Sequence, residues 1–213
     1  MKFIKRMVVI LALLCSAQGY AETEAAKVVP HESMGYTQLN PAQPTSTGKK
    51  IEVLEFFFYP CSHCYKLHPL LTAWENKNPK DVELIYLPTI FTDNMEPMAR
   101  TFYALESLGQ LKRLHDGLYK AIHEQKMDLL NEAQLTDFVV KHGVDRAKFS
   151  KAYNALLTKT KAGRSKKMAV DYGIRGTPTV IVDGKYMIYG LSPKETMQML
   201  DTLLDKARKE RAG

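Results

Sequence analysis

Residues 51–67 read IEVLEFFFYPCSHCYKL, an apolar run that leads directly into a pair of cysteines. The first eight residues have the length and the aromatic content typical of a buried central strand. A helical pattern begins at the cysteines, with apolar side chains recurring at spacings of three and four as far as Trp74. Pro69 lies inside this pattern and predicts a kink. Cys61 and Cys64 are therefore expected where a central strand turns into a helix.

The segments that flank this unit predict one more strand on each side and a long helical block. Residues 82–87 (VELIYL) predict a second strand. Upstream, residues 22–50 are polar and turn-rich and predict a loose lead-in with one short strand near 36–39. From about residue 95 to residue 172 the pattern is helical. Breaks between the helices are expected near Gly109, residues 125–129, Gly143 and Gly163.

The C-terminal part predicts a hairpin followed by a helix. Residues 180–182 and 186–189 read as short strands around Asp183-Gly184-Lys185, a sequence typical of a tight turn. A last amphipathic helix is expected over residues 193–208. The predicted order is βαβ, a helical block, then ββα, which indicates an α/β fold.

Residues 1–21 have the three parts of a secretory signal peptide. Basic residues precede an apolar run at 7–14, and small residues stand at the positions that signal peptidase reads. The apolar run is too short to span a membrane, so we expect cleavage after Ala21. Cys15 raises the alternative of a lipoprotein. Leu14, however, is bulkier than the residue that precedes the cysteine in bacterial lipid-attachment sites.

The composition is that of an ordinary globular protein, with 45% hydrophobic and 25% charged residues. The net charge of +7 comes from scattered Lys and Arg rather than from a basic stripe interleaved with aromatics, so no nucleic-acid partner is expected. Three cysteines exclude a miniprotein held together by disulfides. Once the signal peptide is removed, every remaining cysteine lies in the CSHC motif. A bridge closing so small a loop would contribute little stability, which favours a chemical role.

The position of the cysteines predicts different reactivities for the two sulfurs. The first N–H groups of a helix lack intrahelical partners, and the aligned peptide dipoles place partial positive charge there. Cys61 should therefore titrate well below the ordinary thiol value of about 8.5. Cys64 lies one turn deeper and should be more shielded. A substrate thiolate would then attack Cys61 in the oxidised protein, and the departing thiolate would make the disulfide a strong oxidant.

His63 lies between the cysteines and could act on Cys61. Its ring can donate a hydrogen bond or add positive potential to the thiolate; the alternative is an exposed turn residue. A zinc site built from both cysteines, His63 and His68 is the rival interpretation of the motif. Crowding onto one helix start is poor tetrahedral geometry, so no metal is expected.

Two further features belong with the cysteines. Glu55 interrupts the apolar strand, where a charged carboxylate is costly to bury. It could lie beneath the cysteine helix and receive or relay a proton, or alternatively reach the sheet edge. Thr177-Pro178 comes just before a predicted strand, and a cis bond is suspected there rather than an ordinary trans loop proline.

The chain resembles the DsbA family of periplasmic thiol:disulfide interchange proteins. The resemblance is carried by VLEFF at 53–57, CSHCY at 61–65, GTP at 176–178 and VDGKY at 182–186, and it covers essentially the whole mature chain. It implies a thioredoxin-like fold with an inserted helical domain. The implied boundaries are residues 22–94 and 166–213 for the thioredoxin-like domain and 95–165 for the insert.

The resemblance also implies roles for individual residues. Cys61 would be the nucleophile and Cys64 its partner in the redox-active disulfide. Pro178 would be the cis-proline that faces the disulfide, and Thr177 would offer backbone groups to an extended substrate peptide. Glu55 matches the family's buried acid, and Pro69, named above, matches the kink proline.

Two positions depart from the family pattern. Ser62 replaces the proline of the type motif Cys-Pro-His-Cys, which removes a fixed φ angle and predicts a somewhat weaker oxidant. Tyr86 stands where a lysine often lies opposite the buried acid, which puts the proton relay in doubt.

The function expected from these features is that of a monomeric periplasmic dithiol oxidase without metal or organic cofactor. It would donate its disulfide to unfolded exported proteins with free cysteines, and the resemblance to the DsbA family implies that a DsbB-like membrane quinone reductase reoxidises it. A disulfide isomerase or reductase is one alternative, although isomerases carry a longer amino-terminal dimerisation domain than residues 22–50 could form. A thioredoxin-like metal chaperone that binds through the same cysteines is another.

Overall fold

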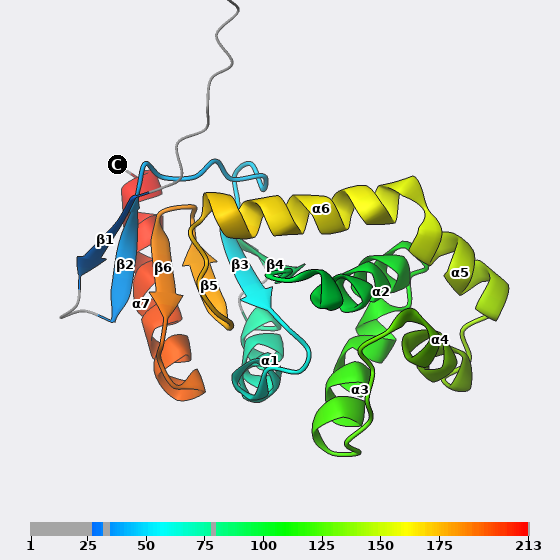
Figure 1. Ribbon diagram of the computed structural model, residues 1–213. Helices are drawn as coiled ribbons and strands as arrows, with labels where there is room; N and C mark the ends of the chain where they lie inside the picture. The colour runs from blue at the N-terminus through cyan, green and yellow to red at the C-terminus, as the bar shows by residue number, and fades with distance from the viewer. Residues whose placement is uncertain (1–26, 32–34, 78–79, 213) are drawn as a thin grey trace, which may run out of the picture.

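The computed structural model describes residues 27–31, 35–77 and 80–212, so the predicted signal segment 1–21 lies outside the described residues. Figure 1 shows a mixed sheet on one side of the molecule and a cluster of helices on the other. Within the described residues the sheet has six strands, in the order β1-β2-β6-β5-β3-β4. The strands are β1 (Lys27–His31), β2 (Tyr36–Asn40), β3 (Ile51–Phe57), β4 (Val82–Pro88), β5 (Thr179–Val182) and β6 (Tyr186–Tyr189).

The strand β3 lies inside the sheet and is buried along its whole length. It pairs in parallel with β4 and antiparallel with β5. Its side chains alternate between two cores, because successive residues of a strand point to opposite faces. Val53 packs in the core that contains residues of α1 (Ser62–Glu75) and α7 (Pro193–Ala212), whereas Leu54 packs in the core that contains residues of α6 (Leu156–Asp171). Both faces are therefore covered, as the continuous apolar run predicts.

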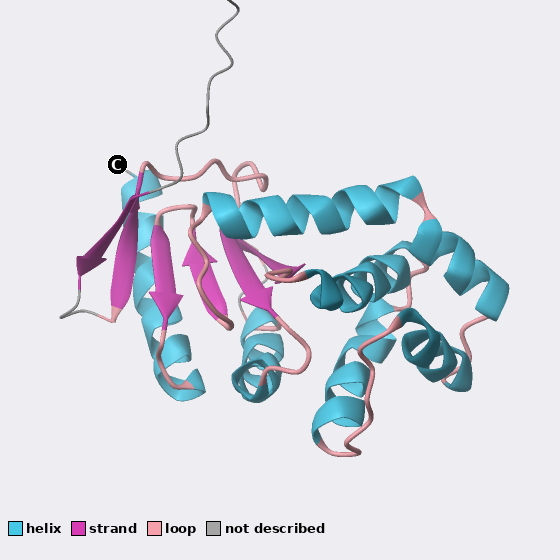
Figure 2. Ribbon diagram, viewed as in Figure 1, coloured by secondary structure: helices cyan, strands magenta, loops and turns pink. Residues whose placement is uncertain are grey.

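The remaining helices lie between β4 and β5 in the chain and stand beside the sheet (Figure 2). The helix α6 leads from this cluster back across the sheet, so the predicted boundary at residue 165 falls within one continuous helix. None of the helices in the described part of the chain is long and apolar enough to cross a membrane. The helices of the cluster are η1 (Asp93–Met95), α2 (Glu96–Ser107), α3 (Leu111–His123), α4 (Glu132–Lys141) and α5 (Arg146–Asn154).

The predicted element order is confirmed, with one wrong helix break and one strand that the sequence did not suggest. The break expected at Gly163 is wrong, because this glycine lies inside α6. The chain bends instead at Ala155, whose ψ of 143° ends α5 before α6 begins. A glycine costs a helix only about 1 kcal/mol, and neighbours such as Ala162 and Ser165 supply the buried face of α6. The additional strand is β1, which pairs with the predicted β2.

The predicted hairpin turn between β5 and β6 is confirmed. Asp183 and Gly184 have φ angles of +55° and +64°, the positive values that a tight type I′ turn requires. The turn lies against the segment before β3, since the main-chain N–H of Gln43 donates to the Gly184 carbonyl at 2.8 Å. A Cβ atom on Gly184 would lie only 2.1 Å from the Gln43 carbonyl oxygen. Close approach and backbone conformation thus both require glycine here.

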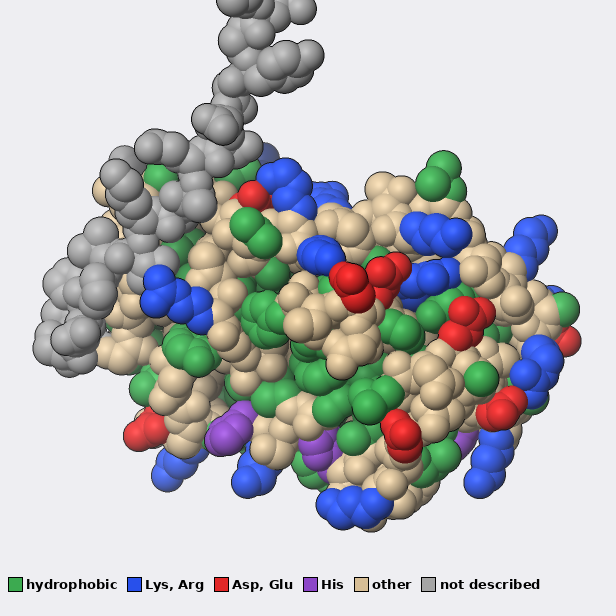
Figure 3. Space-filling model, viewed as in Figure 1, with side chains coloured by type: hydrophobic (Ala, Val, Ile, Leu, Met, Phe, Trp, Pro, Cys, Tyr) green, Lys and Arg blue, Asp and Glu red, His purple; other side chains and the backbone are tan. Residues whose placement is uncertain are grey.

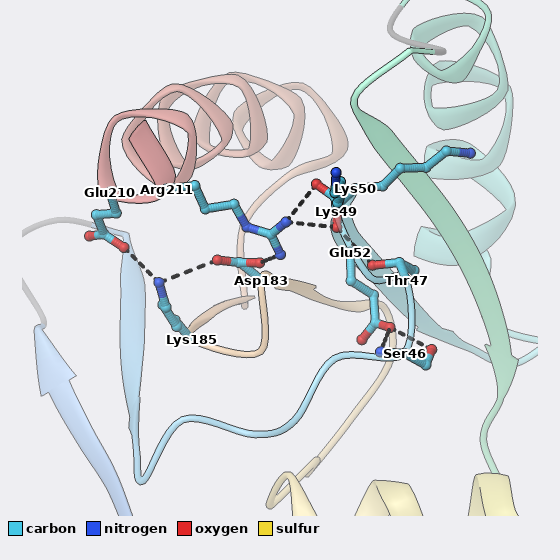
Figure 4. A network of polar contacts seen from close by, with 9 residues as sticks. All are labelled: Ser46, Thr47, Lys49, Lys50, Glu52, Asp183, Lys185, Glu210 and Arg211. Carbon is cyan, nitrogen blue, oxygen red and sulfur yellow. Dashed lines mark hydrogen bonds and ion pairs between the residues drawn. The ribbon is translucent and has the colours of Figure 1, made fainter. Parts of the chain in front are cut away.

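A network of charged side chains ties this turn to the end of α7 (Figure 4). The Asp183 carboxylate is buried and accepts a hydrogen bond from Arg211. Arg211 also donates to the carbonyls of Lys49 and Lys50, at 2.9 and 3.0 Å. The ammonium of Lys185 lies 3.3 Å from Asp183. The network joins the C-terminal helix, the hairpin and the entry to β3, which supports the strand that leads to the cysteines.

Candidate active site

Cys61 is the N-cap residue of α1, directly after the loop that leaves β3. Its backbone is extended, with φ −73° and ψ 117°, and its own N–H donates to the carbonyl of Phe58 at 2.9 Å. The main-chain N–H of Cys64 donates to the Cys61 sulfur at 3.5 Å. The two cysteines are unbridged. The predicted placement at a strand-to-helix turn is confirmed, and the Cys61 sulfur occupies the position at which a helix favours an anion.

The surroundings of Cys61 lower the pKa of its thiol from the ordinary 9.0 to about 5. The largest cause is the hydrogen bond that the Cys64 thiol gives to the Cys61 thiolate, opposed in part by burial. The main-chain N–H groups of Cys64 and His63 and the Thr177 side chain also stabilise the anion. At neutral pH the half-buried Cys61 sulfur is therefore a thiolate.

Cys64 has the opposite environment. Its side chain is 0% exposed, and burial together with the neighbouring Cys61 and Glu55 charges raises the pKa of its thiol far above the ordinary range. A thiol in such a place remains protonated. One sulfur is accordingly an accessible anion and the other a buried neutral donor.

The loop before β5 brings Thr177 and Pro178 to Cys61. The suspected cis peptide bond between these two residues is confirmed; a second cis bond, Asn40–Pro41, was not anticipated. The Cys61 sulfur lies 3.2 Å from the Thr177 carbonyl oxygen, to which its thiol form donates. Residues separated by 116 positions in the chain thus meet at the sulfur.

The imidazole of His63 is on the exposed side of α1, while its main-chain N–H faces the Cys61 sulfur. The contribution of His63 that the geometry supports is therefore that of its backbone. The role predicted for the ring stays a prediction.

Glu55 lies on the face of β3 that packs against α1, as the alternation with Val53 requires. It is 0% exposed, so the alternative of a carboxylate reaching the sheet edge does not apply. Neither carboxylate oxygen has a hydrogen-bond partner among the described residues. Burial, and secondarily the charge of Cys61, raises the pKa of Glu55 to about 8. A carboxyl group of this kind holds its proton near neutral pH and can give it up to a neighbouring base.

Behind Cys64 the structure brings together a group of buried and partly buried aromatic and histidine side chains that sequence reasoning missed. They come from the loop after β3, from α1, from β4 and from α3. From the sequence, His68 is only a candidate zinc ligand and Tyr86 only a departure from the family pattern. A signal was present in the chain, since His68 follows Cys64 by four residues and the α3 members are also four apart. The members are Tyr59, His68, Tyr86, His115 and Tyr119.

A family model described as the DSBA-like thioredoxin domain matches residues 52–200. The chain belongs to the DsbA family. The Thiol:disulfide interchange protein DsbA of Pseudomonas aeruginosa is 35% identical over 176 residues, which cover 81% of this chain and 83% of that protein. The DsbA of Burkholderia cepacia is 35% identical over 208 residues, covering 96% and 97%.

Solved structures agree with this assignment to the DsbA family. The crystal structure of Pseudomonas aeruginosa DsbA is similar with a TM-score of 0.80 and 34% identity, covering 85% of this chain and 96% of that one. The oxidoreductase NmDsbA1 from Neisseria meningitidis is similar with a TM-score of 0.77 and 29% identity, over the same shares. The predicted thioredoxin-like fold with inserted helices is confirmed, and this DsbA-family protein is a thiol:disulfide oxidoreductase.

Proposed function

We propose that this DsbA-family protein donates a disulfide between Cys61 and Cys64 to exported, unfolded proteins that carry free cysteines. The observation that carries the proposal is the contrast between the two thiols. An accessible sulfur with a pKa of about 5 is a good leaving group, and its anion stabilises the reduced form of the enzyme, which makes the disulfide oxidising.

The exchange proceeds in two steps. A client thiolate attacks the Cys61 sulfur, the Cys61–Cys64 bond breaks, and its electron pair goes to Cys64, which takes up a proton. A second client thiolate then attacks the client sulfur of the mixed disulfide, and Cys61 leaves as a thiolate. The client loses two electrons to the enzyme and gains a disulfide. Glu55 is the group proposed to supply the proton to Cys64, because its carboxyl is protonated in the same buried region.

Thr177 and Pro178 are proposed to bind the client main chain beside the Cys61 sulfur. A groove of about 290 Å³ lies next to this loop, between residues 90–91 and 166–175. Its walls include Phe91 and Val170, which are 43% and 67% exposed. Apolar side chains also gather over the middle of the face in Figure 3. Exposed apolar surface near the loop that carries Thr177 and Pro178 suits unfolded clients, which present apolar side chains of their own.

The cellular setting follows from the same proposal. Residues 1–21 would direct export to the periplasm, and a DsbB-like membrane quinone reductase would reoxidise the dithiol of a monomeric enzyme. The thioredoxin-like domain is proposed to comprise residues 22–94 and 166–213, which contain the strands, α1 and α7. Residues 95–165 are proposed as the inserted helical domain, which contains α2 to α5. His63 is proposed to support the thiolate through its main-chain N–H.

Equilibration with glutathione tests the proposal. Purified protein is incubated with mixtures of reduced and oxidised glutathione, and the fraction of dithiol is measured. We expect a potential well above that of thioredoxin, about −270 mV. A value as low as that of thioredoxin would contradict the role of disulfide donor.

Single cysteine variants test the assignment of roles. Cys61→Ser is expected to abolish oxidation of a reduced client, because the accessible nucleophile is lost. When Cys64→Ser is mixed with a client that carries a disulfide, the Cys61 thiolate attacks that disulfide and displaces one client thiolate; the mixed disulfide should accumulate on non-reducing gels, since only a client thiol can then resolve it. If both variants kept turnover, the two cysteines would not be the redox pair.

A further inference from the structure

Four side chains near the cysteine pair carry buried polar atoms without a protein partner. Among the described residues, neither oxygen of Glu55, nor Nδ1 of His68, Nε2 of His115 or the hydroxyl of Tyr119, has a hydrogen-bond partner. The most exposed of them, His68, is only 8% exposed. An unsatisfied buried polar group costs about 1–3 kcal/mol. Proteins usually meet this cost with internal water when several such groups converge.

His68 lies on the same helix as Cys64, and the His115 ring on α3 contacts the His68 ring. His68 follows Cys64 by four residues, so the two side chains share one face of α1, and His68 leans toward the N-terminal turn that holds the sulfur. The ring centroid of His68 lies 4.5 Å from that of His115 and 5.1 Å from that of Tyr119. The second nitrogen of His115, Nδ1, is hydrogen-bonded to the Tyr59 hydroxyl at 2.7 Å.

The same group reaches Glu55 through Tyr86. These two residues are paired in the parallel register of β3 and β4, so their side chains leave the sheet on the same face. The Tyr86 ring lies 5.2 Å from that of His115 and 6.1 Å from that of His68. The Tyr86 hydroxyl is hydrogen-bonded to Thr72. Glu55, Cys64 and the histidines therefore border one polar region beneath α1.

We propose that His68, together with His115 and Tyr119, conducts protons between the surface at the α1–α3 boundary and the Glu55 and Cys64 groups, with water bridging the unpartnered atoms. The inference rests on the proposed function, in which Cys64 is the buried leaving sulfur. When a client thiolate attacks Cys61, Cys64 receives the electron pair of the broken bond and one proton from Glu55. The His68 route delivers a proton from solvent to the Glu55 carboxyl in the same step, so that no buried Glu55 carboxylate is left behind while Cys64 departs.

The chemistry of these side chains suits such a route. Burial lowers the pKa of His68, and it lowers that of His115 well below the ordinary value, so both rings are neutral at neutral pH. A neutral imidazole has one donor and one acceptor nitrogen and can pass a proton from one to the other. A buried thiolate of high pKa leaves slowly unless it is protonated. Proton supply to Cys64 should therefore limit the first exchange.

Titratable groups from four elements and one loop surround His68, His115 and Tyr119 and would shape the pH dependence of the route. They are Cys61 and Cys64 on α1, Tyr86 on β4, Asp116, His115 and Tyr119 on α3, Tyr59 after β3, and Glu55 on β3 itself. The Asp116 charge raises the pKa of His68 and opposes its burial. Asp116 is half exposed, which favours proton entry from the α3 side.

Single-turnover oxidation of a dithiol peptide tests the route. Oxidised His68→Ala and His68→Gln are mixed with the peptide, and the rate of the first exchange is compared with that of the wild-type protein. Glutamine fills a similar volume but cannot take up a proton at neutral pH. The rate of the first exchange is expected to fall by about tenfold or more in both variants. This loss is smaller than the ~10²–10⁴-fold rate factor typical of direct acid–base catalysis. Added imidazole should restore the rate of His68→Ala, whereas the glutathione equilibrium should be unchanged.

Thr101→Val is the matched control. Thr101 is also fully buried, and its hydroxyl has no hydrogen-bond partner in the part of the chain that the structure describes, but it is not a member of this group. It should keep the wild-type rate. Folded His68 variants at the wild-type rate, or a slow His68→Ala that imidazole leaves slow, would overturn the route while leaving the disulfide-donor role intact. If His68→Ala fails to fold, the rate of His68→Gln decides. A wild-type protein that does not oxidise the peptide would overturn both proposals.

Discussion

Two thiols that are three residues apart have opposite protonation states because of their positions on α1. Cys61 caps the helix and is half-buried, so donors that face its sulfur stabilise an anion. Cys64 points into the core, where an anion would lose its hydration without compensation. Burial explains Glu55 in the same way, because it keeps the carboxyl of Glu55 protonated just as it keeps the Cys64 thiol protonated. The chemistry of the pair is set by location rather than by residue type.

Glu55→Gln should change how stability depends on pH. The folded-state pKa of about 8 exceeds the ordinary 4.5, so between these values the unfolded chain releases a proton that the folded protein keeps. The free energy of unfolding of the wild type therefore falls with rising pH across this window. The glutamine variant has no group that titrates in this window, so its free energy of unfolding does not fall in this way. The difference in free energy of unfolding, variant minus wild type, should therefore increase with pH by at most about 5 kcal/mol. Urea unfolding of the reduced proteins at several pH values measures the difference; a pH-independent difference would show that Glu55 titrates normally.

The reactive residues could be predicted from the sequence, but their supporting group could not. The CSHC motif after an apolar run locates both thiols, and the interruption of that run exposes Glu55. His68, His115 and Tyr119 come from helices whose packing against each other depends on tertiary contacts. Their four-residue spacings are equally compatible with ordinary core positions.

At the level of secondary structure, the turn between β5 and β6 is the most demanding element. It places Gly184 against the backbone of Gln43, and its Asp183 anchors the end of α7. Loop segments this tight tolerate few substitutions, because backbone atoms cannot move as freely as side-chain ends.

Gly184→Ala should destabilise the protein by about 2–5 kcal/mol. The positive φ costs about 1–2 kcal/mol for a residue with a Cβ atom, and the clash with the Gln43 carbonyl adds a cost of similar size. Gly143→Ala is the matched control, since Gly143 also has a positive φ but no atom within 4 Å of the added Cβ. The free energy of unfolding of Gly143→Ala should fall only by the cost of the positive φ angle. If urea unfolding showed the same loss of stability for both variants, the Gln43 backbone would be able to move away from the added Cβ atom at no cost.

Apart from β1, the order of strands and helices could be predicted because these elements have a clear hydrophobic period and turn signals at their ends. The predicted break at Gly163 fails for a general reason. A glycine signals a break only if the hydrophobic face also ends there, and the buried face of α6 continues through Ala162, Ser165 and Ala169. The actual bend at Ala155 has no glycine or proline to announce it.

At the level of the complete fold, the site depends on segments that are distant in the chain. The Cys61 sulfur meets Thr177 from the loop before β5, and the group behind Cys64 needs α3 from the inserted helices. Contacts between residues so far apart in the chain cannot be predicted from local hydrophobic periodicity. The resemblance to the DsbA family supplied Thr177 and Pro178, and the sheet register explains why they arrive beside β3.

The reduced protein should be more stable than the oxidised protein at neutral pH. The Cys61 thiolate stabilises the folded dithiol form, and a bridge closing so small a loop adds little. Because the folded pKa of Cys61 is lowered, this stabilisation is complete above the ordinary 9.0 and is lost as the pH falls through about 5. Urea midpoints of the two redox forms should therefore converge in acid. A more stable oxidised form at neutral pH would contradict this expectation.

The most direct test of the account is a titration of the Cys61 thiolate by its ultraviolet absorbance, with the oxidised protein as the blank. We predict a single thiolate that is fully formed at neutral pH and half-titrated near pH 5. The Cys61→Ser variant should lack this transition. A Cys61 that stays protonated at neutral pH and titrates near 9.0 would contradict the account, since nothing would then stabilise the dithiol form over the disulfide.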